Sequence, residues 1–158
     1  MNQKFIQLKE LMPIIVEKLN NDGEVVFTPN GISMKPMLLG GRDVVTLTKV
    51  DKKLKKYDLP LYQRKDGKYI LHRVVKVCKD GTYTMRGDNQ IYNEKGITDD
   101  QIIAIVTKFV RNGKEYSVSN KKYRFYCSFW NFIRIFKLGF DLFKRLCRKV
   151  IRKLKNAD

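Results

Sequence analysis

The sequence predicts a mainly β protein that begins with a short helix and ends with an amphipathic helix. Residues 24–111 contain several segments rich in β-branched and aromatic residues, which is typical of strands. Two Asp-Gly pairs, in YQRKDGKYI and CKDGTYTM, separate such segments, and Asp-Gly between strands is a strong indication of a hairpin. We therefore expect the middle of the chain to form an antiparallel β domain.

An amphipathic helix is expected before the first strand. Leu8, Leu11, Ile14 or Ile15, and Leu19 recur at helical spacing. The turn-forming sequence NNDG then ends the pattern.

Six strand-like segments follow this helix. In order they are EVVFTP, DVVTLTKV, DLPLYQR, KYILHRVVKV, TYTMRG and QIIAIVTKFVR. In KYILHRVVKV, alternation places Ile70, His72 and Val74 on one face of a strand, so His72 is expected to have apolar neighbours.

The C-terminal segment is expected to form a basic amphipathic helix from about Phe129 to Leu154. Apolar residues recur there every three or four positions, and Lys and Arg occupy the positions between them. Residues 120–158 contribute +10 of the formal net charge of +17. We therefore expect a domain over residues 1–119 and a helical tail over residues 120–158.

Three roles are open for this tail. Its apolar stripe could cover the β domain. Alternatively, residues 129–154 could lie on an anionic membrane surface, because aromatic residues on one face and basic residues on the other suit the interface between water and lipid. Positive charge also suits nucleic acid, but no base-reading motif accompanies it, so no nucleic-acid partner is expected.

The cysteines and the N-terminal residues bear on the compartment. Cys78, Cys127 and Cys147 are odd in number and have no CxxC spacing, which argues against a disulfide framework and favours a reducing compartment. The longest uncharged run near the N-terminus, residues 11–16, is far shorter than a secretory or transmembrane segment. We expect a cytoplasmic protein that attaches peripherally to the inner face of the membrane.

A candidate nucleophile lies in GISMKPMLLGGRD, residues 31–43. Ser33 stands between Gly31, which is free in φ, and Pro36, which is fixed in φ, so backbone chemistry sets the path of this loop. On its own the stretch also fits a plain hairpin turn. His72 is the only histidine, and imidazole is the usual base that activates a serine hydroxyl. The chain thus contains the minimum parts for acyl transfer.

Candidate acids lie in MRGDNQIYNEKGITDDQ, which contains Asp88, Glu94, Asp99 and Asp100. A carboxylate near His72 would hold its tautomer and stabilise the imidazolium. Each acid also has an ordinary role, Asp88 in a turn and Asp99 and Asp100 in a loop or helix cap. The orienting role is left open between Asp88 and Glu94, and we slightly favour Asp88 because Gly87 and Asn89 place it in a defined turn.

Taken in order, GISMKP with GGRDVV, then LHRVV, then RGDN with NEKGI resemble the catalytic core of the type I signal peptidases and LexA-like serine peptidases. The resemblance covers about residues 24–111. It implies a fold of coiled antiparallel β-sheets, with the nucleophile on the loop that enters it. It also implies a serine peptidase that requires no cofactor and no metal ion.

The resemblance implies roles for individual residues. Ser33 matches the nucleophile. His72 occupies the position of the catalytic lysine of most bacterial members, as in the endoplasmic-reticulum type, so the chain resembles a Ser-His enzyme. Asp88 matches the aspartate of the Gly-Asp-Asn box, and Glu94 falls where the histidine-type enzymes have their triad acid, usually an aspartate.

The loop residues also match the family. Met34 and Pro36 match the residues that shape the nucleophile loop. Many bacterial members have an oxyanion-binding serine where this chain has Gly31, so only main-chain donors such as the Ser33 N–H are offered there.

Two boxes depart from the family pattern. Arg42 is inserted before Asp43 in GRDVV, and Tyr57 replaces a glycine in YDLPL. We expect neither departure to touch the proposed chemistry.

Two functions of different classes are compatible with these residues. The first is a serine endopeptidase that cleaves a leader or signal-like segment from a peptide or preprotein. The second is a non-catalytic peptide-binding or regulatory module that retains the peptidase fold. The presence of both Ser33 and His72 favours the enzyme.

Overall fold

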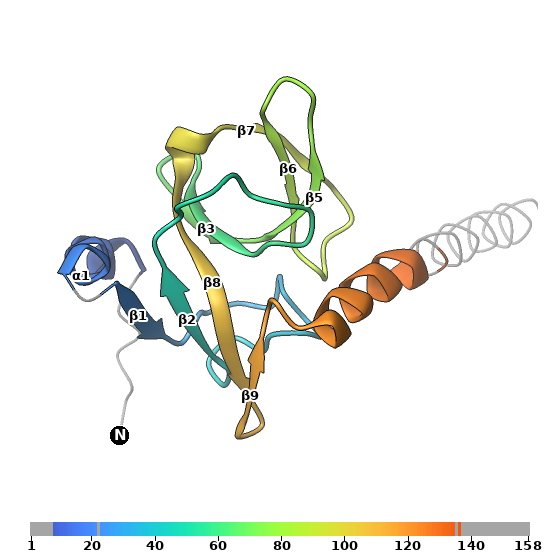
Figure 1. Cartoon of the computed structure of the whole chain (residues 1–158), viewed down its shortest axis with the longest axis horizontal. Helices are drawn as coiled ribbons and strands as arrows, with labels where there is room; N and C mark the ends of the chain where they lie inside the picture. The colour runs from blue at the N-terminus through green and yellow to red at the C-terminus, as the bar shows by residue number, and fades with distance from the viewer. Residues whose placement is uncertain (1–7, 22, 135, 137–158) are drawn as a thin grey trace, which may run out of the picture. The chain divides into compact units, whose positions relative to one another are not determined.

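Antiparallel strands dominate the computed structural model, which describes residues 8–21, 23–134 and 136 (Figure 1). The chain divides into two compact units between Arg124 and Phe125. The first unit contains every strand of the described residues. The prediction of a mainly β protein with antiparallel sheets is confirmed.

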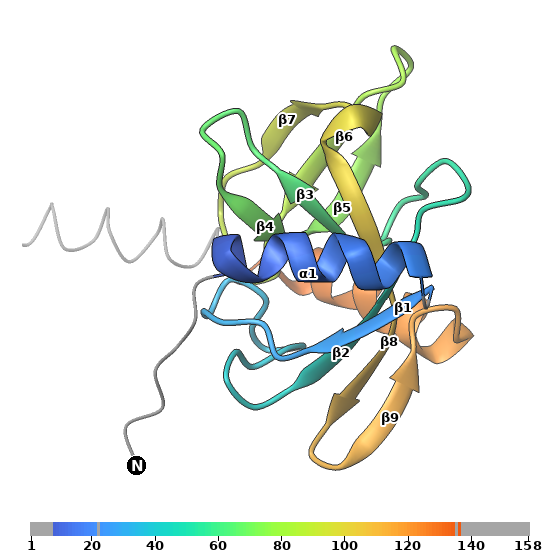
Figure 2. The same ribbon diagram turned by 90° about the vertical axis from the view of Figure 1, so that its left-hand side faces the viewer.

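Helix α1, Leu8–Asn21, has the amphipathic character that the sequence predicts. Met12, Ile15 and Leu19 are buried, whereas Ile14 and Val16 are exposed. Figure 2 shows α1 crossing in front of the strands, with β3 and β4 on one side and β1 and β2 on the other. The helix therefore lies close to both outer strands of the larger sheet.

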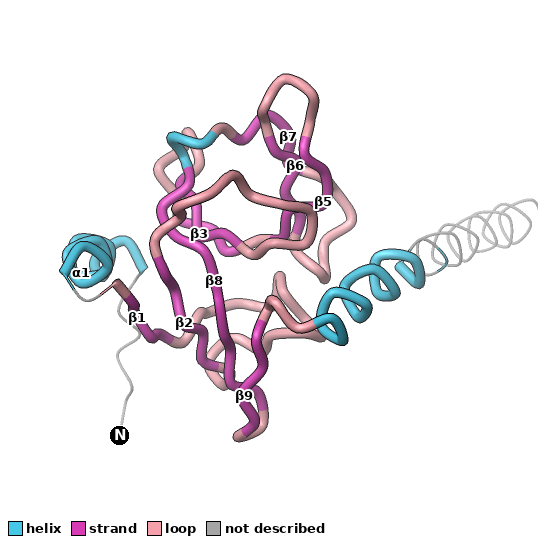
Figure 3. Tube along the Cα trace, viewed as in Figure 1, coloured by secondary structure: helices cyan, strands magenta, loops and turns pink. Residues whose placement is uncertain are grey.

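The strands form two antiparallel sheets (Figure 3). The larger sheet has the order β1-β2-β8-β3-β4, and β9 pairs with β8. Its strands are β1 (Glu24–Phe27), β2 (Val44–Thr48), β3 (Pro60–Gln63), β4 (Tyr69–Leu71), β8 (Ile102–Arg111) and β9 (Lys114–Ser117). The smaller sheet contains β5 (Arg73–Val77), β6 (Tyr83–Arg86) and β7 (Glu94–Ile97).

Tight turns join consecutive strands at the predicted positions. The Asp-Gly pairs lie between β3 and β4 and between β5 and β6, and Gly67 and Gly81 adopt φ of +80° and +82°. A third hairpin joins β8 to β9 through Asn112 and Gly113, both with positive φ. The β8–β9 turn has two residues between the paired Arg111 and Lys114, and two-residue turns with positive φ match the twist of the flanking strands.

The segment KYILHRVVKV is not the single strand that alternation predicts. Its chain leaves β4 in the larger sheet at Leu71 and enters β5 in the smaller sheet at Arg73, with His72 at the crossing. The residues from Leu71 to Val74 are all buried, His72 being only 2% exposed. Alternation fails because a chain that passes between two sheets is covered on both sides.

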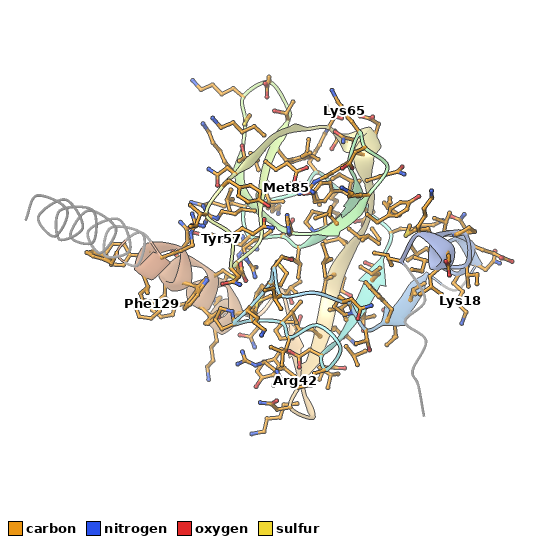
Figure 4. The ribbon with its side chains drawn as sticks, turned by 180° about the vertical axis from the view of Figure 1, so that it is seen from behind. Lys18, Arg42, Tyr57, Lys65, Met85 and Phe129 are labelled. Carbon is orange, nitrogen blue, oxygen red and sulfur yellow. The ribbon has the colours of Figure 1, made fainter. Side chains whose placement is uncertain are left out.

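A hydrophobic core contains residues of both sheets. Its buried members are Leu54, Tyr62, Val74, Tyr83, Met85 and Ile97. In Figure 4, Met85 lies in the interior of the first unit, whereas Lys18 and Arg42 lie at its outside. Burying such a side chain contributes about 1.5–3 kcal/mol, so this cluster is a main source of stability for the elements around His72.

The predicted C-terminal helix is described only in part. Residues 121–134 are helical. Residues 137–158, which include most of the helix expected from Phe129 to Leu154, lie outside the described residues. Within the described part of the chain, no helix combines the length and the apolar character needed to cross a bilayer.

Candidate functional site

Ser33 lies on the loop that joins β1 to β2. Gly31 has a φ of +96°, in the left-handed region that favours glycine. Met34, Met37 and Leu38 are buried and hold the loop against the protein. Ser33 itself is half-buried, so its hydroxyl belongs to a loop that is anchored on one side and open on the other.

The end of this loop is braced by Asp43, which is 1% exposed. Its carboxylate accepts hydrogen bonds from the Leu39 N–H at 2.8 Å and from Nε of Arg42 at 2.6 Å. Burial acts to raise the pKa of Asp43, but the hydrogen bonds from Arg42 and Leu39 outweigh it and lower that pKa. Arg42 therefore supplies the counter-charge of a buried carboxylate at the exit of the Ser33 loop.

A turn that follows β6 packs directly against Ser33. The Asn89 N–H donates to the Ser33 carbonyl at 2.8 Å, and Asn89 Nδ2 donates to the Ile32 carbonyl at 3.3 Å. A Cβ on Gly87 would lie 3.1 Å from both Ser33 Cβ and His72 Nε2. Gly87 thus stands between serine and imidazole, and only a residue without a side chain allows this approach.

His72 presents its two ring nitrogens to different neighbours. Nε2 faces Gly87 on the side of Ser33. Nδ1 is 3.4 Å from the hydroxyl of Tyr62, which is the imidazole's only hydrogen bond among the described residues. General-base contacts commonly tighten when substrate binds, so an unoccupied Nε2 beside a serine is compatible with base catalysis.

Burial controls the charge of this histidine. Desolvation lowers the pKa of His72 to about 4, and the positive charge of Arg64 acts in the same direction. The carboxylates of Glu94 and Asp88 oppose that shift. The imidazole is therefore neutral at pH 7, which is the form that accepts a proton.

The two candidate acids have different partners. Both carboxylate oxygens of Asp88 accept hydrogen bonds from the Arg73 guanidinium, at 2.8 and 2.7 Å, in a buried ion pair. Glu94 accepts hydrogen bonds from Arg64, at 2.7 and 2.6 Å, and from the Tyr62 hydroxyl at 2.7 Å. The structure therefore brings Glu94 near His72 through Tyr62.

The other two acids of this segment lie elsewhere. Asp99 pairs with Lys53 and accepts a hydrogen bond from Tyr83, and Asp100 is exposed in the short helix η1, Asp99–Gln101. Both lie in the first turn of η1, whose N-cap is Thr98, so neither is the cap residue that the sequence suggests.

A pocket of about 370 Å³ opens beside Ser33. It is lined by Leu8 and Leu11 of α1, Phe27–Gly31, Ser33, Met34, Leu38, Gly40 and Tyr69–Leu71. Most of these residues are apolar, and β1 and β4, which flank the pocket, lie at the two ends of the strand order β1-β2-β8-β3-β4. The pocket can accept an extended apolar segment next to the serine hydroxyl.

Sequence reasoning missed four residues of this site, namely Tyr62, Arg64, Arg73 and Gly40. Arg73 directly follows His72 in a segment of strand-like residues. A buried arginine requires a carboxylate partner, so the sequence could have suggested its pairing with Asp88. Gly40 has no room for a Cβ, because the backbone of Asn30 and Gly31 lies against it. Tyr62 and Arg64 carried no local signal, since they reach the site through the pairing of β3 with β4.

No protein-family model, no curated protein and no solved structure matches this chain. Within the described residues, no cluster of three or more His, Cys, Asp or Glu side chains has the geometry to hold a metal ion. The arguments for a function therefore come from the geometry of the site and from the sequence.

Proposed function

We propose that this protein is a serine endopeptidase of the signal peptidase type, which cleaves a leader or signal-like segment from a peptide or preprotein. The observation that supports this most directly is the arrangement around Gly87. Ser33 Cβ and His72 Nε2 flank this glycine at the same distance of 3.1 Å from its Cβ position. A nucleophile that lines an apolar pocket and a neutral base thus both lie beside Gly87.

The chemistry follows from the roles of these two residues. His72 Nε2 accepts the proton of the Ser33 hydroxyl while Oγ attacks the scissile carbonyl carbon, which forms a tetrahedral oxyanion. Main-chain N–H groups of the loop, including that of Ser33, would hold this oxyanion. The C–N bond then breaks, Nε2 returns the proton to the leaving amine, and water hydrolyses the acyl-enzyme by the same steps.

Substrate would bind as an extended chain. The outer strands β1 and β4 flank the pocket and offer unpaired backbone groups to a peptide strand. The apolar lining suits the uncharged residues of a leader segment.

The test is cleavage of synthetic peptides by the full chain, followed by mass spectrometry. The mixture should include extended peptides with small and apolar residues and any precursor peptide encoded near this protein. Ser33→Ala and His72→Ala should each reduce turnover by roughly 10³-fold or more, whereas Ser119→Ala, which removes an exposed hydroxyl, should not. Cleavage that survives in Ser33→Ala would contradict the proposal.

The second candidate is a peptide-binding or regulatory module without turnover. The same pocket supports it, since an extended peptide can bind between β1 and β4 without being cut. Binding of the peptide mixture without any product, equal in wild type and Ser33→Ala, would favour this alternative.

We further propose that the C-terminal helix attaches the enzyme to an anionic membrane surface. Phe125, Phe129, Phe132 and Phe136 are 72%, 51%, 58% and 64% exposed, and their spacing places them along one side of a helix. Basic residues accompany them, and the tail contributes +10 to the net charge. An anionic bilayer satisfies both features, because it takes up aromatic side chains and attracts Lys and Arg.

A further inference from the structure

We propose that Tyr62 is a positioning residue that connects His72 to Glu94, so that the acid of this site acts through a phenol. The inference rests on the peptidase function proposed above. The Tyr62 hydroxyl lies 3.4 Å from His72 Nδ1 and 2.7 Å from Glu94 Oε2. One hydroxyl therefore touches both the base and the carboxylate.

Counting protons gives this chain of contacts a direction. A phenol has one proton, and the Tyr62 hydroxyl donates it to Glu94, which is ionised and can only accept. The phenol oxygen must then accept at its contact with His72, so Nδ1 carries the imidazole proton. Nε2, on the side of Ser33, is left with a lone pair, as a general base requires.

Glu94 is held in place for this role by Arg64. The guanidinium donates from Nε to Oε1 at 2.7 Å and from Nη2 to Oε2 at 2.6 Å. Partial burial acts to raise the pKa of Glu94, but the hydrogen bonds from Arg64 and Tyr62 outweigh it and lower that pKa. Glu94 thus remains an acceptor for Tyr62 at neutral pH.

Tyr62 itself is fixed and does not titrate in the working range. Its side chain is 0% exposed within the core cluster, and its backbone lies in β3 between β4 and β8. Burial and the neighbouring Glu94 both raise the pKa of its hydroxyl above the ordinary value of a tyrosine. The phenol is therefore a permanent dipole, whose oxygen faces the imidazole.

This dipole matters when His72 accepts the serine proton. The imidazolium then carries positive charge, and a phenol oxygen polarised by Glu94 stabilises it at Nδ1. The proton of Tyr62 stays on Tyr62 throughout, so the contact orients and stabilises without transferring a proton. Asp88, which is ion-paired with Arg73, acts on His72 through its charge.

The first test measures the tautomer of His72, which is unambiguous because the chain has one histidine. NMR of the ring nitrogens of isotope-labelled full-length protein should show Nδ1 protonated and Nε2 unprotonated near neutral pH. In Tyr62→Phe, Nδ1 loses its acceptor, so the population should shift toward the form protonated at Nε2. A wild-type protein protonated at Nε2, or an unchanged tautomer in Tyr62→Phe, would overturn the proposal.

Tyr83→Phe is the matched control. Tyr83 is 1% exposed, and its hydroxyl donates to the Asp99 carboxylate at 2.8 Å. It therefore loses the same kind of buried hydrogen bond as Tyr62→Phe, away from His72. The control should leave the tautomer unchanged, whereas an equal shift in both variants would show that the effect is structural and would sink the proposal.

The second test is kinetic and uses the peptide identified by mass spectrometry. Tyr62→Phe should lower kcat roughly 10- to 100-fold with little change in KM, and Tyr83→Phe should retain wild-type kcat. The losses caused by Tyr62→Phe and Glu94→Gln should be less than additive in the double variant, because both changes cut the same connection. Additive losses in kcat would contradict the proposal that Glu94 acts through Tyr62. The NMR result stands without any cleavage assay, so a failure of the peptidase function is distinguished from a failure of the Tyr62 connection.

Discussion

At the scale of single residues, the environment of His72 determines when it can act. Desolvation lowers its pKa from an ordinary 6.5 to about 4. A buried imidazole favours its neutral form because charge is costly away from water. The carboxylates of Glu94 and Asp88 limit that cost, so in the proposed reaction the histidine can accept a proton although it is neutral at rest.

This environment leads to a prediction for the pH dependence. The value of kcat/KM should be close to its maximum at pH 6.5 and should fall only as the pH approaches 4, because only the neutral imidazole accepts the serine proton. NMR titration of the single histidine measures its pKa, and the pH profile of kcat/KM measures the loss of activity at low pH. A titration midpoint of 6.5 for His72 in the free protein would contradict the lowered pKa and the burial of this side chain.

The same shift has a consequence for stability. The unfolded chain binds a proton at His72 at higher pH than the folded chain does, so protonation favours unfolding. The contribution of His72 to stability is complete above pH 6.5 and is lost as the pH falls through about 4. Urea unfolding at several pH values between 4 and 6.5 measures the free energy of unfolding. It distinguishes activity that is lost because His72 is protonated from activity that is lost because the protein unfolds.

At the scale of elements, the site depends on how closely the turn after β6 packs on the Ser33 loop. Gly87→Ala should abolish turnover, because the new Cβ would lie 2.6 Å from the Ser33 carbonyl oxygen and 3.1 Å from His72 Nε2. Cleavage assays and thermal unfolding together measure this. Gly96→Ala is the control, since Gly96 has a φ of +73° but open space around it. It should cost about 1–2 kcal/mol of stability and leave turnover intact. Wild-type turnover in Gly87→Ala would refute the packing argument.

The elements also show what the sequence can and cannot predict. Local signals located α1, the Asp-Gly hairpins and the strands rich in β-branched residues, since these depend on neighbours in the chain. The break at His72 was missed, because a strand that changes sheets keeps the same local composition. The contact of Tyr62 with Glu94 was missed for a similar reason, since 32 positions separate the two residues.

Tyr57 adopts a backbone conformation that is uncommon for residues other than glycine. Its φ is +78°, in a region that glycine reaches without strain. Its carbonyl accepts a hydrogen bond from Arg73 Nη1 at 3.2 Å, and Arg73 binds Asp88. Tyr57 is thus connected to Asp88 through Arg73.

At the scale of the whole molecule, charge is divided unevenly along the chain. Residues 120–158 contribute +10 of the formal net charge, and residues 1–119 contribute +7. In the described part of the tail, three aromatic pairs lie along the helix, Phe125 with Phe129, Tyr126 with Trp130 and Phe132 with Phe136. Exposed aromatic rings beside basic residues are typical of a segment that lies at a membrane interface.

This division leads to a prediction for membrane binding. The full-length protein should co-sediment with anionic phospholipid vesicles and not with neutral ones, and binding should weaken as salt rises, because salt screens the attraction of Lys and Arg.

Phe129→Glu with Phe132→Glu should weaken binding at least tenfold, since each change removes an apolar contribution on the order of 1.5–3 kcal/mol. Ile14→Glu with Val16→Glu is the control, because these residues are 55% and 41% exposed on α1, and it should bind as wild type does. Equal binding by the double phenylalanine variant and the wild type would contradict the membrane-anchor proposal. Duplex DNA that displaced the protein from vesicles at the same salt concentration would also contradict it. Cleavage of a water-soluble peptide by the phenylalanine variant should remain at the wild-type level, because none of the residues around Ser33 and His72 is altered.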